Sequence, residues 1–307
     1  MNYREKLHII QELTGLSQEK LAQQLGVAFS TLNKWINEKA QPRKSAQKQI
    51  DVLFGDISGI KEEAGSALKA KLSIIQNKRK SHKSIIHTIV NYPDIHNQFV
   101  LSLTYNTNSI EGSTLTEHET KVVLFENAAL GHKTLKEQLE VKNHQAALEF
   151  LFSFIMQKKK VDIAFILRLH SILMNGIRDD AGAFRNHAVR IVGANVPTAN
   201  HLKVRELMNG LLKKINSEKN GIVYHSAYIH SVFEKIHPFS DGNGRVGRLL
   251  AYAMLLSQNY PPAVILQKKR NTYMKALNRS QRDDDFDLLH EFFADSVLEG
   301  FKILERI

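Results

Sequence analysis

The sequence lacks cysteine altogether and has no long apolar run, and each absence excludes a class of protein. Without cysteine, the chain of 307 residues forms neither disulfides nor thiolate metal sites. None of its apolar runs approaches the roughly 18 residues that a membrane-spanning helix requires. Its N-terminus also lacks the charged and then apolar pattern of a secretory signal. We therefore expect a soluble, cytoplasmic protein without a membrane partner.

The residues that are present are those of an ordinary globular protein with a basic surplus. Hydrophobic residues make up 43% and charged residues 24% of the chain, which is typical of folded protein, and the length has room for more than one domain. Lysine and arginine number 42 against 31 for aspartate and glutamate, a formal charge of +11. The surplus agrees with an anionic partner such as ATP or a nucleic acid, but it identifies neither.

Residues 237–248 gather the side chains of a phosphate-transfer site. The stretch reads HPFSDGNGRVGR. His237 carries an imidazole that accepts a proton near neutral pH, and Asp241 is a hard oxygen ligand for a metal ion. Glycines let backbone N–H groups turn toward an anion, and arginine forks bind phosphate oxygens in pairs. The residues that suit phosphate binding are Gly242, Asn243, Gly244, Arg245 and Arg248.

Helical periodicity flanks this stretch on both sides. Apolar residues share one helical face from about Tyr224 to His237, and leucines recur at helical spacing afterwards until residues 258–262 end the second helix. His237 then lies at the mouth of a helix, loop, helix unit. Arg245 and Arg248 share one face of the second helix near its N-terminus, the end that favours anions.

Three other titratable residues have simpler explanations. His170 lies on the apolar face of a predicted helix, so we interpret it as a core histidine. His230 and Glu234 are four residues apart and resemble half of a zinc site, but no third and fourth ligand accompany them. We therefore predict no zinc site.

The twelve residues match the signature of the Fic family, His-x-Phe-x-Asp/Glu-Gly-Asn-Gly-Arg-x-x-Arg, at every defined position. The resemblance implies an all-α fold and transfer of AMP from ATP to a Ser, Thr or Tyr hydroxyl of a target protein. By position, His237 is the base, Asp241 holds Mg²⁺ and Arg248 faces the γ-phosphate, while Phe239 is a buried anchor. The other phosphate contacts are Gly242, Asn243, Gly244 and Arg245.

Two alternatives remain open beside AMP transfer. The same site could transfer another group, such as phosphate, UMP or phosphocholine, or remove AMP from a modified target. Some family members that phosphorylate carry lysine near the second glycine, and Gly244 here favours the AMP-transferring type. The second alternative is a transcription regulator that uses the Fic fold as a nucleotide sensor.

A helix predicted near residues 98–112 ends in Thr107-x-x-x-Glu111-Gly112, ahead of a capping box at Thr116. A glutamate at a helix end is usually just solvated. This one resembles the inhibitory motif of Fic proteins that carry this helix on the N-terminal side, although Ser113 stands where asparagine is common. The resemblance implies that Glu111 pairs with Arg248 and occupies the place of the γ-phosphate, so that the protein inhibits itself.

Residues 1–55 form a separate predicted unit, and residues 16–43 resemble the helix-turn-helix of the lambda-repressor or XRE class. In that class the second helix of the motif enters the major groove of DNA. A small bundle that binds protein or forms a homodimer is the alternative. The residues that would face DNA are Ser30, Thr31, Asn33 and Lys34.

The rest of the chain is assigned more coarsely. Residues 56–90 are interpreted as a basic helical linker, and residues 91–307 as the catalytic domain. Within it, Tyr273 and Asn278 are structural or approach the adenine. Residues 182–197 break the helical rhythm with a short β run, which is a surface hairpin or, by the resemblance, a flap that pairs with the target segment. The β run consists of Val189, Arg190, Ile191 and Val192.

Overall fold

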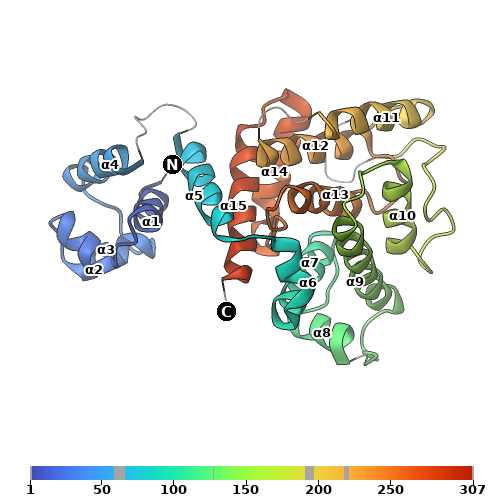
Figure 1. Ribbon diagram of the computed structural model, residues 1–307, viewed down its shortest axis with the longest axis horizontal. Helices are drawn as coiled ribbons and strands as arrows, with labels where there is room; N and C mark the ends of the chain where they lie inside the picture. The colour runs from blue at the N-terminus through green and yellow to red at the C-terminus, as the bar shows by residue number, and fades with distance from the viewer. Residues whose placement is uncertain (1, 59–65, 127, 191–196, 218–220, 306–307) are drawn as a thin grey trace. The chain divides into compact units, whose positions relative to one another are not determined.

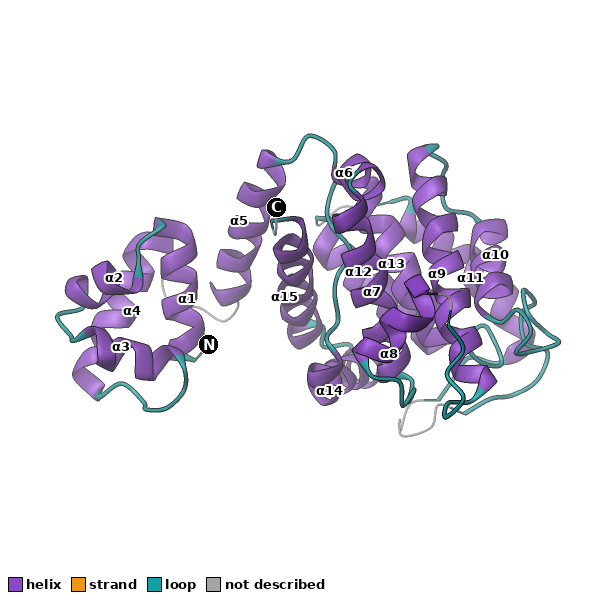
Figure 2. Ribbon diagram, turned by 90° about the horizontal axis from the view of Figure 1, so that it is seen from below, coloured by secondary structure: helices purple, strands orange, loops and turns teal. Residues whose placement is uncertain are grey.

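The structure is a computed structural model that describes residues 2–58, 66–126, 128–190, 197–217 and 221–305. Helices and irregular segments make up this part of the chain, and it contains no strand (Figure 2). The all-α prediction is therefore confirmed. None of the helices described is both long and apolar enough to cross a membrane.

The chain divides into two compact units, residues 1–81 and 82–307. The division falls inside the segment expected to be a linker, so that segment contributes one helix to the first unit and one to the second. Each unit has its own buried apolar core, which is what an independently folding domain requires.

The first unit begins with helix α1 (Tyr3–Thr14), and local capping explains its helix boundaries. Asn2 and Glu5 form a reciprocal capping box at its start, and Gly15 ends it with φ +66°. Ser17 caps the next helix. Leu32 and Trp35 of α3 are buried, as their helical spacing predicts. The other helices of this unit are α2 (Gln18–Gln24), α3 (Phe29–Ile36), α4 (Lys44–Ser58) and α5 (Ser66–Ser81).

The second unit is a helical bundle around α13 (Asn243–Ser257), which is buried along almost its whole length. A helix that is buried on all sides belongs in the centre of a domain, and here α9 (Leu135–Met156), α10 (Ile163–Leu173) and α12 (Ile222–Ile236) pack around it (Figure 1). The other helices are α6 (Ile85–Asn91), α7 (Pro93–Ile110), α8 (Glu117–Lys121), α11 (Val204–Ile215), α14 (Arg270–Asp283) and α15 (Asp287–Leu304), with short η1 (Val122–Glu126), η2 (His201–Lys203) and η3 (Gln267–Lys269).

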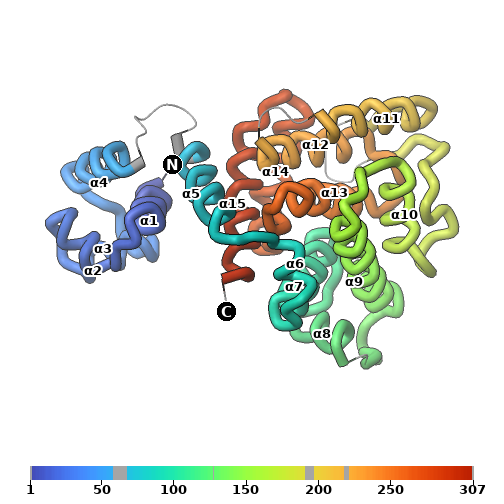
Figure 3. The backbone as a smooth tube through the Cα atoms, viewed as in Figure 1, coloured from blue at the N-terminus to red at the C-terminus, as the bar shows by residue number. Residues whose placement is uncertain are grey.

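Helix α7 carries the predicted inhibitory motif and is longer than expected. It starts at Pro93, whose ring suits the first helical turn, and it ends at Ile110 with Glu111 as its C-cap. The backbone then runs through α8 to α9, and α7 packs against α9 (Figure 3). Glu111 is thereby carried into the same bundle as α13.

The expected β run is not found where the structure describes it. Val189 and Arg190 are irregular, and Ile191 and Val192 lie outside the described residues. Thr198 donates a side-chain hydrogen bond to the backbone carbonyl of Val189 (2.8 Å), so side-chain bonding rather than strand pairing closes the described ends of this segment.

Candidate functional site

His237 terminates α12 in an unusual backbone conformation. Its φ is +53° and its ψ +62°, in the left-handed region that non-glycine residues seldom adopt. Its N–H caps the helix by donating to the Phe233 carbonyl (2.9 Å), and Arg185 donates to its carbonyl (2.7 Å). The turn directs the chain away from α12 and into the loop that leads to α13.

The His237 ring has one nitrogen engaged with the backbone. Nδ1 lies 3.2 Å from the Glu234 carbonyl oxygen, which assigns the proton to Nδ1 and leaves Nε2 as an acceptor. Burial lowers the pKa of His237, with the Glu234 carbonyl opposing and the charge of Arg185 adding to the decrease. A neutral imidazole with Nε2 unprotonated is the form that a general base requires.

Phe239 and Asn243 lock the loop between the two helices. The Asn243 side chain accepts from the Phe239 N–H and donates to the Phe239 carbonyl, each at 2.9 Å. Phe239 is fully buried and stacks on His170 with 3.8 Å between ring centroids. Both polar atoms of the Asn243 side chain thus serve the loop, so a phosphate contact from this residue would come from its backbone.

The N-terminus of α13 forms the other end of the loop. Gly242 is its N-cap with φ +78°, a conformation that favours glycine, and Met174 fills the space that a Cβ would need there. The Gly242 N–H donates to Oδ1 of Asp241 (2.6 Å). The Asp241 side chain is 45% exposed, so its carboxylate is open to a ligand.

Arg248 is completely buried and is bound by Thr107 of α7 and by Glu111, the C-cap of that helix. Its NH2 lies 2.5 Å from Oε1 of Glu111, and its Nε donates to the hydroxyl of Thr107. Burial alone raises the pKa of Glu111, but the charge and hydrogen bond of Arg248 outweigh it and lower that pKa. Because a Cβ on Gly244 would overlap Glu111, the carboxylate lies directly against the α13 backbone.

Arg245 is held by a residue that sequence reasoning missed. Its NH1 pairs with Glu140 of α9 at 3.1 Å, and its NH2 lies 3.8 Å from Asp241. Glu140 belongs to no motif in the sequence of α9, so only the packing of α9 against α13 reveals its partner. The two arginines of the motif therefore have different carboxylate neighbours, Glu140 and Asp241 for Arg245 and Glu111 for Arg248.

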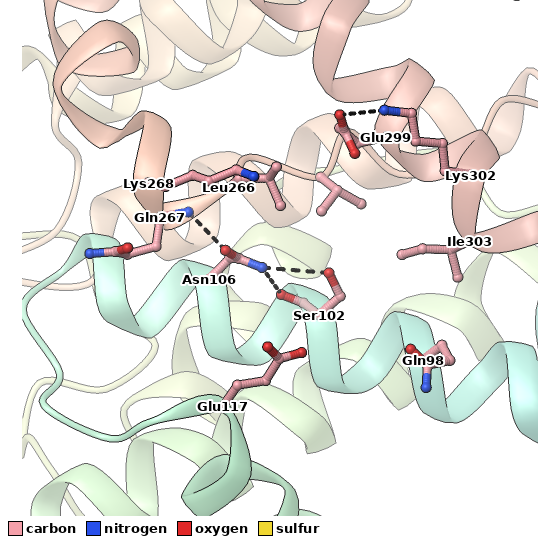
Figure 4. Close-up of a pocket in the computed structure, with 11 residues that line it drawn as sticks. Gln98, Ser102, Asn106, Glu117, Leu266, Gln267, Lys268, Glu299, Lys302 and Ile303 are labelled. Carbon is pink, nitrogen blue, oxygen red and sulfur yellow. Dashed lines mark hydrogen bonds and ion pairs between the residues drawn. The ribbon is translucent and has the colours of Figure 1, made fainter. Parts of the chain in front are cut away.

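The end of α7 is tied to η3 and to the first residue of α14. The Gln267 N–H donates to Oδ1 of Asn106 (2.7 Å), and Arg270 donates to the Ile110 carbonyl (2.8 Å). Figure 4 shows Asn106 between Gln267 and Ser102 in the wall of a pocket of about 280 Å³. These bonds fix the turn that carries Thr107 and Glu111, and the sequence offered no signal for them.

Glu234 and His230 are buried on the inner side of α12. One carboxylate oxygen of Glu234 lies 3.9 Å from Nδ1 of His237, while burial and the charge of Glu111 raise the pKa of Glu234 to about 8. Nε2 of His230 lies 2.6 Å from the hydroxyl of Tyr273. These contacts give Tyr273 a structural role in the core of the bundle.

The predicted DNA-facing residues lie on α3 of the first unit. Ser30 and Lys34 are exposed, whereas Thr31 and Asn33 are half-buried. Asn33 accordingly bonds within the unit, since its amide donates to Gln18 (3.3 Å). Phe29 is a large apolar side chain beside Ser30 and is 47% exposed.

Comparison with known proteins agrees with these two sites. Residues 160–255 match the Fic/DOC family, and residues 7–55 match a helix-turn-helix family. The protein adenylyltransferase Fic of Drosophila persimilis is 30% identical over 184 residues, which cover 59% of this chain and 36% of that protein. That of Drosophila ananassae is also 30% identical, with 59% and 37% covered. The chain thus spans little more than a third of the length of these relatives.

Solved structures give the same fold. A Fic domain containing signaling protein from Bacteroides thetaiotaomicron matches with a TM-score of 0.65 at 23% identity, covering 76% of this chain and 97% of that one. Fic-1 from C. elegans matches with a TM-score of 0.67 at 20% identity, covering 93% and 84%. The likeness of residues 160–255 to the Fic/DOC family therefore extends to the fold, and residues 7–55 resemble a helix-turn-helix.

Proposed function

We propose that the chain transfers AMP from ATP to a Ser, Thr or Tyr hydroxyl of a target protein, with His237 as the general base. The observation that carries the proposal is the state of the His237 ring, whose Nδ1 is engaged by the Glu234 carbonyl and whose pKa is lowered by burial. The curated relatives named above as protein adenylyltransferases support the same reaction.

In the proposed reaction the target hydroxyl oxygen attacks the α-phosphorus of ATP. Nε2 of His237 takes the hydroxyl proton, a P–O bond forms to the target, and the bond from the α-phosphorus to the bridging oxygen breaks. Pyrophosphate leaves with that bond's electron pair. Such in-line displacement depends mainly on positioning and on neutralising charge, which this site supplies with one base and two arginines.

The phosphates would bind at the N-terminus of α13. Its first N–H groups have no partner within the helix, and Arg245 and Arg248 project from its first two turns. Magnesium commonly binds through one carboxylate together with substrate phosphates, and the half-exposed Asp241 fits that donor set. Bound there, Mg²⁺ would neutralise phosphate charge.

We further propose that Glu111 inhibits this reaction. Its carboxylate holds the Arg248 guanidinium at 2.5 Å and lies against Gly244, where an incoming phosphate would need both the arginine and the helix N-terminus. Thr107 adds a hydrogen bond to the same guanidinium. Displacing Glu111 would release Arg248 for the γ-phosphate.

The identity of the transferred group is tested with ATP labelled at either the α- or the γ-phosphate. Full-length Glu111→Gly protein is incubated with magnesium and each ATP in lysate, and modified proteins are weighed intact. AMP transfer gives α-label only, with the mass of one AMP residue. Phosphate transfer gives γ-label instead, and label from neither ATP would shift the proposal to a nucleotide sensor.

A second function is favoured by the exposed face of α3, namely DNA binding through the helix-turn-helix. Ser30 and Lys34 are free to meet bases and phosphates there, and Phe29 adds an apolar contact that suits a thymine methyl. A gel shift with the DNA upstream of the protein's own coding sequence tests this at low salt, where phosphate contacts are strongest. Absence of a retained complex under those conditions would refute it.

A further inference from the structure

Arg185 is a buried cation whose described partners are all backbone carbonyls. It is 4% exposed, and its Nε donates to the carbonyl of His237 (2.7 Å). NH1 donates to the carbonyl of His187 (2.7 Å), and NH2 to that of Ala199 (2.5 Å). Among the residues that the structure describes, no carboxylate pairs with it. A planar fork with five donors is the side chain that can reach several carbonyls at once.

The carbonyls that Arg185 binds belong to two different functional segments. One is the C-terminal end of α12, where NH2 also lies 3.4 Å from the Ile236 carbonyl. The negative end of the helix dipole favours a cation at this place. The other segment runs from His187 to Ala199 and includes the stretch expected to align the target. One guanidinium therefore joins both described ends of that segment to the proposed base.

The loop before Arg185 is tied to the motif loop at two further points. The Arg185 N–H donates to the Pro238 carbonyl (3.0 Å). His170 accepts from the Gly182 N–H (2.9 Å), and its other ring nitrogen lies 3.1 Å from the Asp241 carbonyl. Arg185 therefore bonds to the motif loop directly, and Gly182 is linked to it through His170, which makes Arg185 part of a fixed frame.

We infer that Arg185 is a positioning residue, which holds His237 in its left-handed conformation and ties this base to the backbone at His187 and Ala199. The inference rests on the proposed AMP transfer. Arg185 has no contact with the α13 N-terminus or with Arg248, so its role concerns the attacking hydroxyl and not ATP. Its loss should therefore lower the rate of transfer while ATP binding stays intact.

The test compares Arg185→Lys with its parent Glu111→Gly in the full chain. Lysine keeps the charge but cannot reach three carbonyls together. We expect kcat for target modification to fall at least ten-fold, as misplacement of a reacting group does, with KM for ATP within two-fold. Arg168→Lys, at an exposed arginine of α10, is the matched control and should leave both unchanged. A kcat within two-fold of the parent, or a KM that rises as kcat falls, would overturn the inference.

A second measurement separates this inference from the proposed function. The His237 ring is followed by NMR during a pH titration of Arg185→Lys and Arg185→Gln. Burial lowers the pKa of His237 and the charge of Arg185 lowers it further, so Gln should raise that pKa while Lys leaves it low. Both variants should also shift the ring resonance. If neither the resonance nor the pKa of the His237 ring changes in either variant, Arg185 does not hold His237. If instead the Glu111→Gly parent shows no AMP transfer, only the proposed function is refuted.

Discussion

The two functional regions differ in where their side chains find partners. Arg248 of the second unit is buried and contacts Thr107 and Glu111, which lie 141 and 137 positions away in the sequence. On α3 of the first unit, by contrast, Lys34 and Ser30 are exposed, and Asn33 bonds to Gln18 in the neighbouring helix. The buried region is therefore assembled by contacts between residues that are far apart in the sequence. The exposed side chains of α3 do not by themselves identify a binding partner.

The largest effect is expected at His237, the proposed general base. Its substitution tests whether the buried region performs the chemistry. In the Glu111→Gly background, His237→Ala should lower the initial rate of AMP transfer by about 100- to 10,000-fold, the usual contribution of a general base. ATP affinity measured by calorimetry should change little, since the proposed phosphate contacts come from α13 and not from His237. Loss of ATP binding together with activity would mean that the site has collapsed.

The difference between buried and exposed side chains can also be tested through the stability of the protein at Glu234. Ionising a buried carboxyl costs free energy, whereas ionising an exposed one does not. The pKa of Glu234 is raised from the usual 4.5 of a glutamate to about 8, chiefly by burial, so its contribution to stability is present below pH 4.5 and is lost as pH rises toward 8. Glu234→Gln should therefore increase the free energy of unfolding by a few kcal/mol at pH 8. Little change is expected near pH 4.5.

Urea denaturation at both pH values measures this difference. Glu126→Gln is the matched control, since Glu126 is exposed and should leave the unfolding free energy unchanged at either pH. An equal gain for Glu234→Gln at both pH values would contradict the protonated state assigned to Glu234 and attribute the effect to packing.

The smallest effect is expected on α3, where single side chains contribute to a large polar surface. Lys34→Ala should weaken DNA binding several-fold and lower the salt dependence by about one released counterion. The loss should be similar for specific and unrelated DNA, because a lysine that contacts phosphate carries no sequence information. Fluorescence anisotropy over a salt series measures both quantities. An unchanged affinity would remove Lys34 from the interface.

Much of the fold was predictable because local patterns determine it. Each of these patterns determines the structure of residues close to it in the sequence. They are the capping box at Thr116, the apolar spacing of α12 and α13, and the glycine at position 242. The sequence also predicted that Glu111 meets Arg248, but only through resemblance to a family. Nothing in the periodicity of either segment brings them together.

The supporting contacts were beyond sequence reasoning for a physical reason. Glu140 reaches Arg245, and Asn106 reaches Gln267, only because helices remote in sequence pack side by side. Arg185 was visible as part of a loop, but its carbonyl partners carry no side-chain signal at all. The predicted β run is not formed at Val189 and Arg190, because a composition that favours strands does not by itself supply a neighbouring strand to pair with.

The most direct test of the central claim compares initial rates of AMP transfer in wild type, Glu111→Gln and Glu111→Gly, with α-labelled ATP and magnesium. The account predicts at least a ten-fold increase for Glu111→Gly. Glu111→Gln should be intermediate, since it keeps the bulk against Gly244 but loses the charge that holds Arg248. Equal rates in all three proteins, with activity that still depends on His237, would show that Glu111 does not restrain the site.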